Sequence, residues 1–151
     1  MIMSNIIIRK IGKEDIATAR RLFLILQEVF EVKEPFVADE MHLMRLLTDE
    51  RFICFVVTAN DKVLGGLTAY ELPMYHTAYS ECYIYDVGVH ANYQRMGIGK
   101  QLIAALKEYC RTHNIKTMFV EAQEADGHAI EFYRSTGADE ERVVHFNYDC
   151  E

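Results

Sequence analysis

A strand-like run that leads through a glycine turn into an amphipathic segment constrains the fold of this chain more than any other feature. Residues 80–90 (SECYIYDVGVH) are rich in β-formers, and the turn Gln94–Gly99 (QRMGIG) follows closely. Apolar residues then recur with the 3.6-residue period of a helix over 94–113, at Ile98, Leu102, Leu106, Tyr109 and Cys110. This succession predicts an α/β protein with helices packed on a sheet.

Two helices are expected before this run. Residues 5–11 alternate like a first strand, and a helix begins at about Asp15. Its apolar stripe is Ala19, Phe23, Leu26 and Phe30. Glu34-Pro35 ends this helix, because the residue before a proline disfavours the α conformation. A short second helix over 39–48 is expected to bury Met41, Leu43, Met44 and Leu47.

The remaining segments complete a mixed sheet. Residues 51–59 and 62–72 form a hairpin around Asn60-Asp61, and residues 116–122 are a buried strand. Asp126 is a plausible N-cap for one more helix that Gly137 ends, and residues 140–149 alternate like a final strand. We therefore expect one domain over residues 1–151, of class α/β (α+β), with about four helices on a mixed sheet.

Composition excludes several function classes. The net charge of −7 argues against a nucleic-acid binder and suits a polycationic ligand. No apolar run approaches the ~20 residues of a membrane span. Residues 1–15 carry neither a long apolar stretch nor a small-residue cleavage site, so we expect no signal peptide. The four cysteines form no CxxC pair, which favours reduced thiols in a cytosolic protein and no metal site.

The glycine turn is the main chemical signal. Gly97 and Gly99 let the backbone approach a ligand without a Cβ in the way, and the helix that follows offers free N–H groups and a positive dipole end. This combination suits a pyrophosphate. The turn is neither GxGxxG nor a P-loop, and a glycine turn that merely starts a helix remains the alternative.

Two motifs extend the signal to a family. Gln94–Gly99 fits Q/R-x-x-G-x-G/A, and Ala129–Tyr133 (AIEFY) fits A-x-x-x-Y at a helix start. With this order of elements the chain resembles the GNAT acetyltransferase superfamily. The resemblance implies the GNAT fold, in which a bulge splays two parallel strands, here eased by Gly88.

Further stretches between about residues 40 and 149 are similar to the GNAT-type aminoglycoside 3-N-acetyltransferases. They are Ala69–Pro73 (AYELP), Glu81–Val89 (ECYIYDVGV), Val120–Gln123 (VEAQ) and Val144–Asp149 (VHFNYD). That family carries AY-x-LP, E-x-YIYD-x-AV, VQA and HFDID. Glu121 departs from VQA, Gly88 replaces an alanine, and Asn147-Tyr148-Asp149 has one acid where the family has two.

The resemblance implies acetyl-CoA as cofactor. Its pyrophosphate would lie on the backbone of the turn, and its pantetheine arm would pair with the preceding strand near Val87 and Val89. The backbone N–H near Val87 would polarise the thioester carbonyl. The implied cofactor-binding residues are Val87, Gly88, Val89, Gln94, Arg95, Met96, Gly97, Ile98, Gly99, Lys100, Asp126, Ala129 and Tyr133.

Direct transfer to an amine in a ternary complex requires a base. Asp86, at the end of the central strand, is the first candidate; the alternative is a strand-end aspartate that holds a loop amide. Glu81 is the second candidate, as substrate ligand or base through water, and it can equally be solvated. Tyr133 matches the family's general acid and can otherwise be a core residue. His90 and His145 carry no functional signal.

The implied acceptor is a small cationic amine, foremost the 3-amino group of an aminoglycoside. The implied enzyme is a cytoplasmic homodimer, of a kind associated with antibiotic resistance. Substrate-binding residues are then Glu81, Tyr83, Tyr85, Asp86, Gln123 and Asp149, although the tyrosines can also serve sheet packing. Two alternatives stay open. One is a GNAT enzyme for a polyamine, amino acid or protein N-terminus, and the other is an acetyl-CoA-binding module without turnover.

Overall fold

The computed structural model describes residues 5–151. The first four residues, part of the segment for which we expect no signal peptide, lie outside the described residues. The chain forms two compact units, Met1–Glu121 and Ala122–Glu151. The first contains β1 (Ile6–Lys10), α1 (Ile16–Val29), α2 (Glu40–Thr48), β2 (Phe52–Ala59), β3 (Lys62–Pro73), β4 (Ser80–Val89), a 3-10 turn (Ala91–Tyr93), α3 (Ile98–Thr112) and β5 (Ile115–Val120), and the second contains α4 (Gly127–Ser135).

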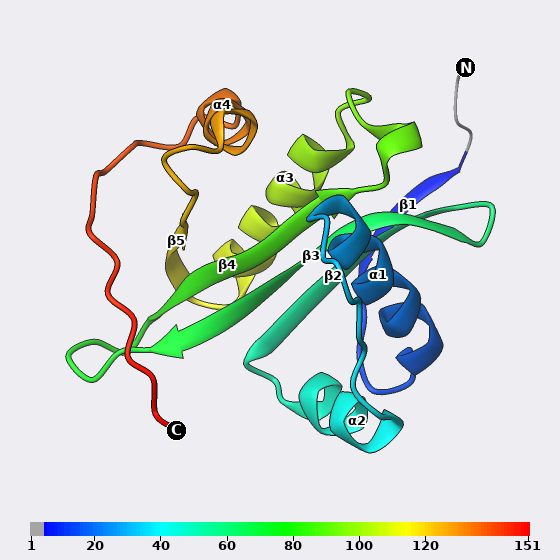
Figure 1. Ribbon diagram of the computed structural model, residues 1–151. Helices are drawn as coiled ribbons and strands as arrows, with labels where there is room; N and C mark the ends of the chain where they lie inside the picture. Colours follow the sequence, from blue (N-terminus) through cyan, green and yellow to red (C-terminus); the bar gives the residue numbers. More distant parts are fainter. Residues whose placement is uncertain (1–4) are drawn as a thin grey trace. The chain divides into compact units, whose positions relative to one another are not determined.

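The five strands form one mixed sheet in the order β1-β2-β3-β4-β5 (Figure 1). β1 to β4 pair antiparallel with their neighbours, and β4 pairs with β5 in parallel. The predicted hairpin is β2–β3, and its turn residues Asn60 and Asp61 both adopt positive φ, as a tight turn demands. The predicted fold class is therefore confirmed for the sheet and its helices.

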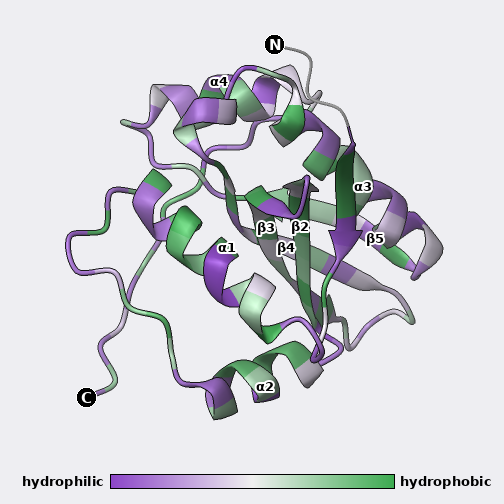
Figure 2. Ribbon diagram, turned by 90° about the vertical axis from the view of Figure 1, so that its right-hand side faces the viewer, coloured by the Kyte–Doolittle hydropathy of each residue, from purple (hydrophilic) through white to green (hydrophobic). Residues whose placement is uncertain are grey.

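Helices α1 and α2 pack on one face of the sheet. Ala19, Leu22 and Leu26 of α1 are buried where the helix packs on β3 and β4, in a cluster that also includes Phe52, Cys54 and Val56 of β2. In Figure 2 hydrophilic and hydrophobic residues alternate around α1, while β2, β3 and β4 behind it are coloured hydrophobic over much of their length. Phe30, which the sequence predicts as part of the apolar stripe, is 48% exposed. Helix α1 ends at Val29, so Phe30 is its C-cap residue and does not continue the buried face of the helix.

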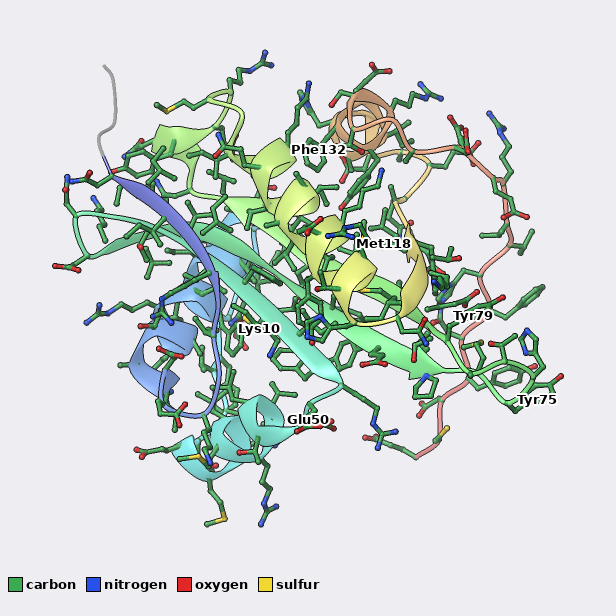
Figure 3. The ribbon with its side chains drawn as sticks, turned by 180° about the vertical axis from the view of Figure 1, so that it is seen from behind. Lys10, Glu50, Tyr75, Tyr79, Met118 and Phe132 are labelled. Carbon is green, nitrogen blue, oxygen red and sulfur yellow. The ribbon has the colours of Figure 1, made fainter. Side chains whose placement is uncertain are left out.

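Helix α3 covers the opposite face, as Figure 3 shows from behind. Its buried residues are Ile98, Leu102, Ile103, Leu106 and Cys110. The helix begins four residues later than the apolar period suggests, because Gly97 adopts the left-handed conformation as N-cap. Cys54, Cys82 and Cys110 are buried and Cys150 is exposed, and all four are free thiols.

Two expectations for α2 are wrong. Met41 and Met44 are 65% and 40% exposed, whereas Leu43 and Leu47 are buried. Asp39, whose side chain accepts the N–H of His42, fixes where the helix begins. Leu43 and Leu47, spaced i and i+4, then face the core together with the partly buried Leu46, and the two methionines lie off this side.

In the second unit, α4 has the predicted cap and stop: the Asp126 carboxylate accepts the Ala129 N–H at 3.0 Å, and Gly137 has φ +87°. The predicted final strand is wrong, because residues 138–151 contain no helix or strand. Alternation shows that a segment tolerates a pleat, but a strand also needs a ladder partner, which alternation does not specify. Among residues 5–151, no helix has the length and apolar character to cross a membrane.

Candidate active site

An extra residue in β4 organises the candidate site. Thr68 of β3 pairs with Asp86, and its neighbour Ala69 pairs with Ile84, so Tyr85 has no partner in the register. Two residues of β4 therefore face one step of β3, which defines a β-bulge. The sequence places this bulge at Gly88, three residues further on, and that position is wrong.

The bulge brings Tyr85 and Asp86 to the same face of the sheet. In a regular strand adjacent side chains point to opposite faces. Here Tyr85 contacts Tyr70, and Asp86 contacts Thr68, which shares its face with Tyr70. Gly88 also points to this face, since a Cβ there would lie 2.8 Å from Leu26 Cδ2 of α1. Gly88 is thus required by the close approach of α1 rather than by the bulge.

The pairing on the two edges of β4 differs beyond the bulge. Pairing with β5 ends at Ile84 and Val120, whereas pairing with β3 continues to Val89 and Gly65. Val87 and Val89, the residues expected to meet the pantetheine arm, thus lie in a segment with a ladder on one edge only. The splayed parallel strands expected from the resemblance are present, and the second edge of this segment can accept an extended ligand.

Asp86 is held by a side chain of the neighbouring strand β3. Its Oδ2 accepts the Thr68 hydroxyl at 2.9 Å, and Thr68 itself is 5% exposed. Burial raises the pKa of the Asp86 carboxyl above its usual range, and the Thr68 hydrogen bond opposes that rise. A raised pKa brings a carboxylate closer to the range in which it accepts protons efficiently. Sequence reasoning missed Thr68, whose proximity depends on the β3–β4 register.

The glycine turn combines left-handed residues with a helix N-terminus, as backbone anion nests do. Gly97 has φ +78° and Arg95 has φ +62°, so left-handed residues alternate with others just before α3. Successive N–H groups in such a turn converge on a concave anion site at a helix N-terminus. A Cβ on Gly97 would meet nothing within 4 Å, which leaves space for a ligand. The residues present therefore fit the pyrophosphate of coenzyme A.

The side chains of the turn have different tasks. Gln94 Nε2 donates to the Val89 carbonyl at 2.9 Å and ties the turn to the end of β4. Ile98 is buried, so only its backbone can face a ligand. Arg95, Met96 and Lys100 are exposed, and Gly99 is half-buried. His90 accepts the Asn92 N–H with Nδ1 and caps the 3-10 turn, which agrees with a structural role.

An aromatic row runs from Asp86 towards β5. Tyr70 meets Tyr85 edge-on at 5.9 Å, Tyr85 meets Tyr83 at 5.9 Å, and Tyr83 stacks on Phe119 at 4.8 Å between ring centroids with 8° between planes. Tyr85 is 62% exposed, and Tyr70 and Phe119 are each 37% exposed. The sequence suggested Tyr83 and Tyr85 but not Tyr70 or Phe119, which the strand register adds.

Glu81 and Glu121 lie along the same row. Glu81 is two residues before Tyr83, so alternation places it on this face, on the order of 15 Å along β4 from Asp86. Tyr83 donates its hydroxyl to Glu121 Oε2 at 3.4 Å. The structure thus brings Asp86, Tyr85 and Tyr83 together and sets Glu81 at the far end of the row.

The other predicted site residues belong to the second unit. Asp126 and Ala129 are joined in the α4 cap, and the Gln123 carbonyl accepts the Asp126 N–H at 2.9 Å. The ring of Tyr133 lies 5.0 Å from that of Phe132. Asp149 Oδ1 accepts the Glu151 N–H at 3.0 Å, and His145 contacts Asn147 at 3.0 Å.

Solved structures with this fold include aminoglycoside acetyltransferases. The chain is 37% identical to meta-AAC0020 from an uncultured soil metagenomic sample, solved in complex with sisomicin, over 97% of each chain with a TM-score of 0.94. It is 29% identical to HMB0005 from an uncultured soil metagenomic sample, over 97% of this chain and 99% of that one, with a TM-score of 0.92. These likenesses extend over nearly the whole chain.

The match to a curated relative covers a shorter part of the chain. The [ribosomal protein bS18]-alanine N-acetyltransferase of Escherichia coli (strain K12) is 26% identical over 94 residues, which span 62% of this chain and 60% of the relative. Less than two thirds of that enzyme is therefore matched.

The splayed β4 edge and the glycine turn that follows it suit a coenzyme A-dependent acyltransferase, because the edge can accept an extended arm and the turn a pyrophosphate. Residues 19–138 match the Acetyltransferase (GNAT) family, and the chain belongs to it. Enzymes of this family use acetyl-CoA.

Proposed function

We propose that this chain acetylates an amine of an aminoglycoside, foremost the 3-amino group, directly from acetyl-CoA in a ternary complex. The observation that carries the proposal is Asp86, which the bulge turns to the same face as the exposed aromatic row. A carboxylate beside a broad aromatic surface suits a ring-shaped polycation. The likeness to meta-AAC0020 supports the same substrate class.

Each residue has a defined task in this proposal. Acetyl-CoA supplies an activated thioester carbonyl when bound. The turn Gln94–Gly99 holds its pyrophosphate through backbone N–H groups, and the open edge of Val87–Val89 orients its arm. A β4 N–H near Val87 polarises the carbonyl oxygen.

Asp86 Oδ binds the acceptor ammonium and takes one proton, which leaves the amine lone pair free to attack. Glu81 binds a more distant ammonium rather than acting as the base, because it lies too far along β4 from Asp86. Tyr133 would donate its phenol proton to the coenzyme A thiolate as the C–S bond breaks, and the second proton that the acetylated nitrogen loses would restore the phenol. The proposal treats residues 1–151 as a single catalytic domain, and the family match over residues 19–138 supports this. The proposal also includes a homodimer and a contribution of Gln123 and Asp149 to acceptor binding.

One other acceptor has specific support. The bS18-alanine N-acetyltransferase relative favours a protein N-terminus as acceptor. A thiol-release assay with aminoglycosides, polyamines, free amino acids and an N-terminal alanine peptide discriminates these acceptors. Turnover of aminoglycosides with the highest kcat/KM supports the proposal. Turnover of the peptide alone would replace the aminoglycoside proposal. If no acceptor in the panel causes thiol release, the binding-module alternative is left.

Cofactor binding is tested separately by thermal unfolding. At ~100-fold excess over its Kd, acetyl-CoA should stabilise the protein by about 2.7 kcal/mol. Gly97→Val should remove this shift, because it places a side chain in the nest. Gly137→Val is the matched control, since Gly137 also has a positive φ (+87°) and a Cβ there also meets nothing within 4 Å, but it lies outside the turn. Loss of the shift in both variants would contradict the assignment of the nest.

Acceptor charge is tested by salt. The KM for a cationic acceptor should rise with ionic strength, because exposed charges are screened over ~8–10 Å at physiological salt. A KM that does not change with salt, or a preference for anionic amines, would contradict a cationic acceptor.

A further inference from the structure

The β5 side of the aromatic row carries a carboxylate that the catalytic proposal does not use. Glu121 follows β5 directly and accepts the Tyr83 hydroxyl through Oε2 at 3.4 Å. Tyr83 is itself held by its stacked contact with Phe119, at 4.8 Å between ring centroids. The carboxylate is therefore tied to a rigid pair of rings on two neighbouring strands, rather than to a free loop.

The position of this carboxylate matches an elongated cationic ligand. The row Tyr70–Tyr85–Tyr83–Phe119 lies next to Asp86, where the proposal places the reacting amine, and Glu121 of the neighbouring strand joins it at Tyr83. Its exposed ring faces are negatively polarised, so they attract C–H bonds of a sugar face and nearby ammonium groups. A ligand that extends along the row from Asp86 thus presents its remote groups to Glu121.

The sequence adds a second reason to examine Glu121. The 3-N-acetyltransferases that the chain resembles have glutamine in the VQA stretch, and they have two acids where this chain has Asn147-Tyr148-Asp149. Compared with that family, the chain therefore has one acid fewer in its C-terminal stretch and one acid more, Glu121, next to Tyr83. An amide offers both donors and acceptors, whereas a carboxylate only accepts and carries charge, so the exchange favours an ammonium over a hydroxyl.

We propose that Glu121, oriented by Tyr83, is a specificity-determining residue that binds an acceptor ammonium remote from the amine that is acetylated. The inference rests on the proposed function and names the feature of the substrate that this chain selects. It does not assign Glu121 a part in proton transfer. Its effect therefore falls on KM and on the choice between acceptors, and not on kcat at saturation.

The experiment compares acceptors that differ by one amine. Paromamine has a hydroxyl in place of one amine of neamine, and kanamycin A has a hydroxyl in place of one amine of kanamycin B. Wild-type protein should prefer the amine-bearing member of at least one pair. Glu121→Gln, which restores the family's amide, should lower that preference about 10- to 100-fold, the range of a lost hydrogen bond to a charged group. Its kcat for the hydroxyl-bearing member should stay within a few-fold of wild type.

Two further variants isolate the cause. Tyr83→Phe keeps the ring and removes the donor, so it should lower the same preference by a smaller factor without changing kcat. Glu14→Gln, in the exposed turn between β1 and α1, makes the same change in net charge and should leave the preference unchanged. If wild type acetylates these acceptors but Glu121→Gln keeps the wild-type preference in both pairs, the inference is overturned alone. If wild type acetylates none of them, the proposed function falls together with the inference.

Discussion

The two halves of β4 follow each other in sequence but differ in their surroundings. Residues 80–84 pair with β3 on one edge and β5 on the other, and Cys82 and Ile84 are fully enclosed. Residues 86–89 pair with β3 alone, after an unpaired Tyr85 has shifted the register. The first half is paired on both edges, while the second half has one unpaired edge and carries the Asp86 carboxylate.

This difference shows how one inserted residue separates structure from function. Without the bulge, Asp86 and Tyr85 would point to opposite faces, and the Asp86 carboxylate would be removed from the aromatic row. With the bulge, the two side chains lie on one face of the sheet, and the β3–β4 ladder is interrupted at Tyr85. Bulges are frequent next to active sites for this reason. The predictions below test whether the division between the halves is as sharp as the pairing indicates.

The largest effect should come from exchanging carboxylate for amide in each half. Asp86→Asn keeps the shape and removes the proton acceptor, so kcat should fall by at least ~100-fold, the lower limit for general base catalysis. Glu81→Gln makes the same exchange in the first half and should change kcat only a few-fold. Steady-state kinetics with a saturating acceptor measure both. A loss confined to Glu81→Gln would reverse the assignment and make Glu81 the leading base.

Stability distinguishes lost chemistry from lost folding. Because burial raises the pKa of Asp86 in the folded protein, ionisation disfavours the folded state once the pH exceeds the unfolded-state pKa. The penalty is absent at lower pH and complete above the raised pKa. At neutral pH, Asp86→Asn should therefore unfold at the same or a higher denaturant concentration than wild type. A lower midpoint would mean that the activity loss reflects a damaged fold.

The next effect concerns the packing of α1 on the second half. Gly88→Val should destabilise the protein by about 1–3 kcal/mol, because even a Cβ would lie 2.8 Å from Leu26 Cδ2. Chemical denaturation gives the difference in unfolding free energy. Gly127→Val, where a Cβ meets nothing, should change it by much less. Equal losses would show that Gly88 serves the backbone and not the helix contact.

The sequence predicted those parts of the molecule that local periodicity specifies. The strand pairs around Asn60-Asp61, the caps of α4 and the turn at Gly97 all depend on neighbours within a few residues. The bulge at Tyr85 and the Thr68–Asp86 hydrogen bond depend on the register between strands that are distant in sequence. The same limit explains the error at residues 140–149, where alternation did not specify a partner strand.

A smaller effect should follow from the hydroxyl that supports Asp86. Thr68→Val removes the hydrogen bond that lowers the pKa of Asp86 and leaves the burial that raises it. The acid limb of the kcat/KM profile should therefore move to higher pH, while the plateau above it changes less than about tenfold. Thr58→Val, further along the sheet on β2, serves as control and should leave the limb in place. An acid limb that moves to lower pH in Thr68→Val would contradict Asp86 as the titrating base.

The smallest effect should appear where the second half of β4 leads into the nest. Arg95 is held at φ +62°, a conformation that disfavours residues with a Cβ by roughly 1–2 kcal/mol and glycine hardly at all. Glycine also loses more chain entropy on folding, by roughly 0.5–1 kcal/mol, so the two terms partly cancel. Arg95→Gly should thus raise the unfolding free energy by at most about 1.5 kcal/mol. It should preserve the thermal shift with acetyl-CoA, because the nest uses backbone N–H groups. Arg95→Ala, which removes the same guanidinium but keeps a Cβ, should gain no such stability. If both variants lose the cofactor shift, the Arg95 side chain binds the phosphates, and the backbone alone does not explain cofactor binding.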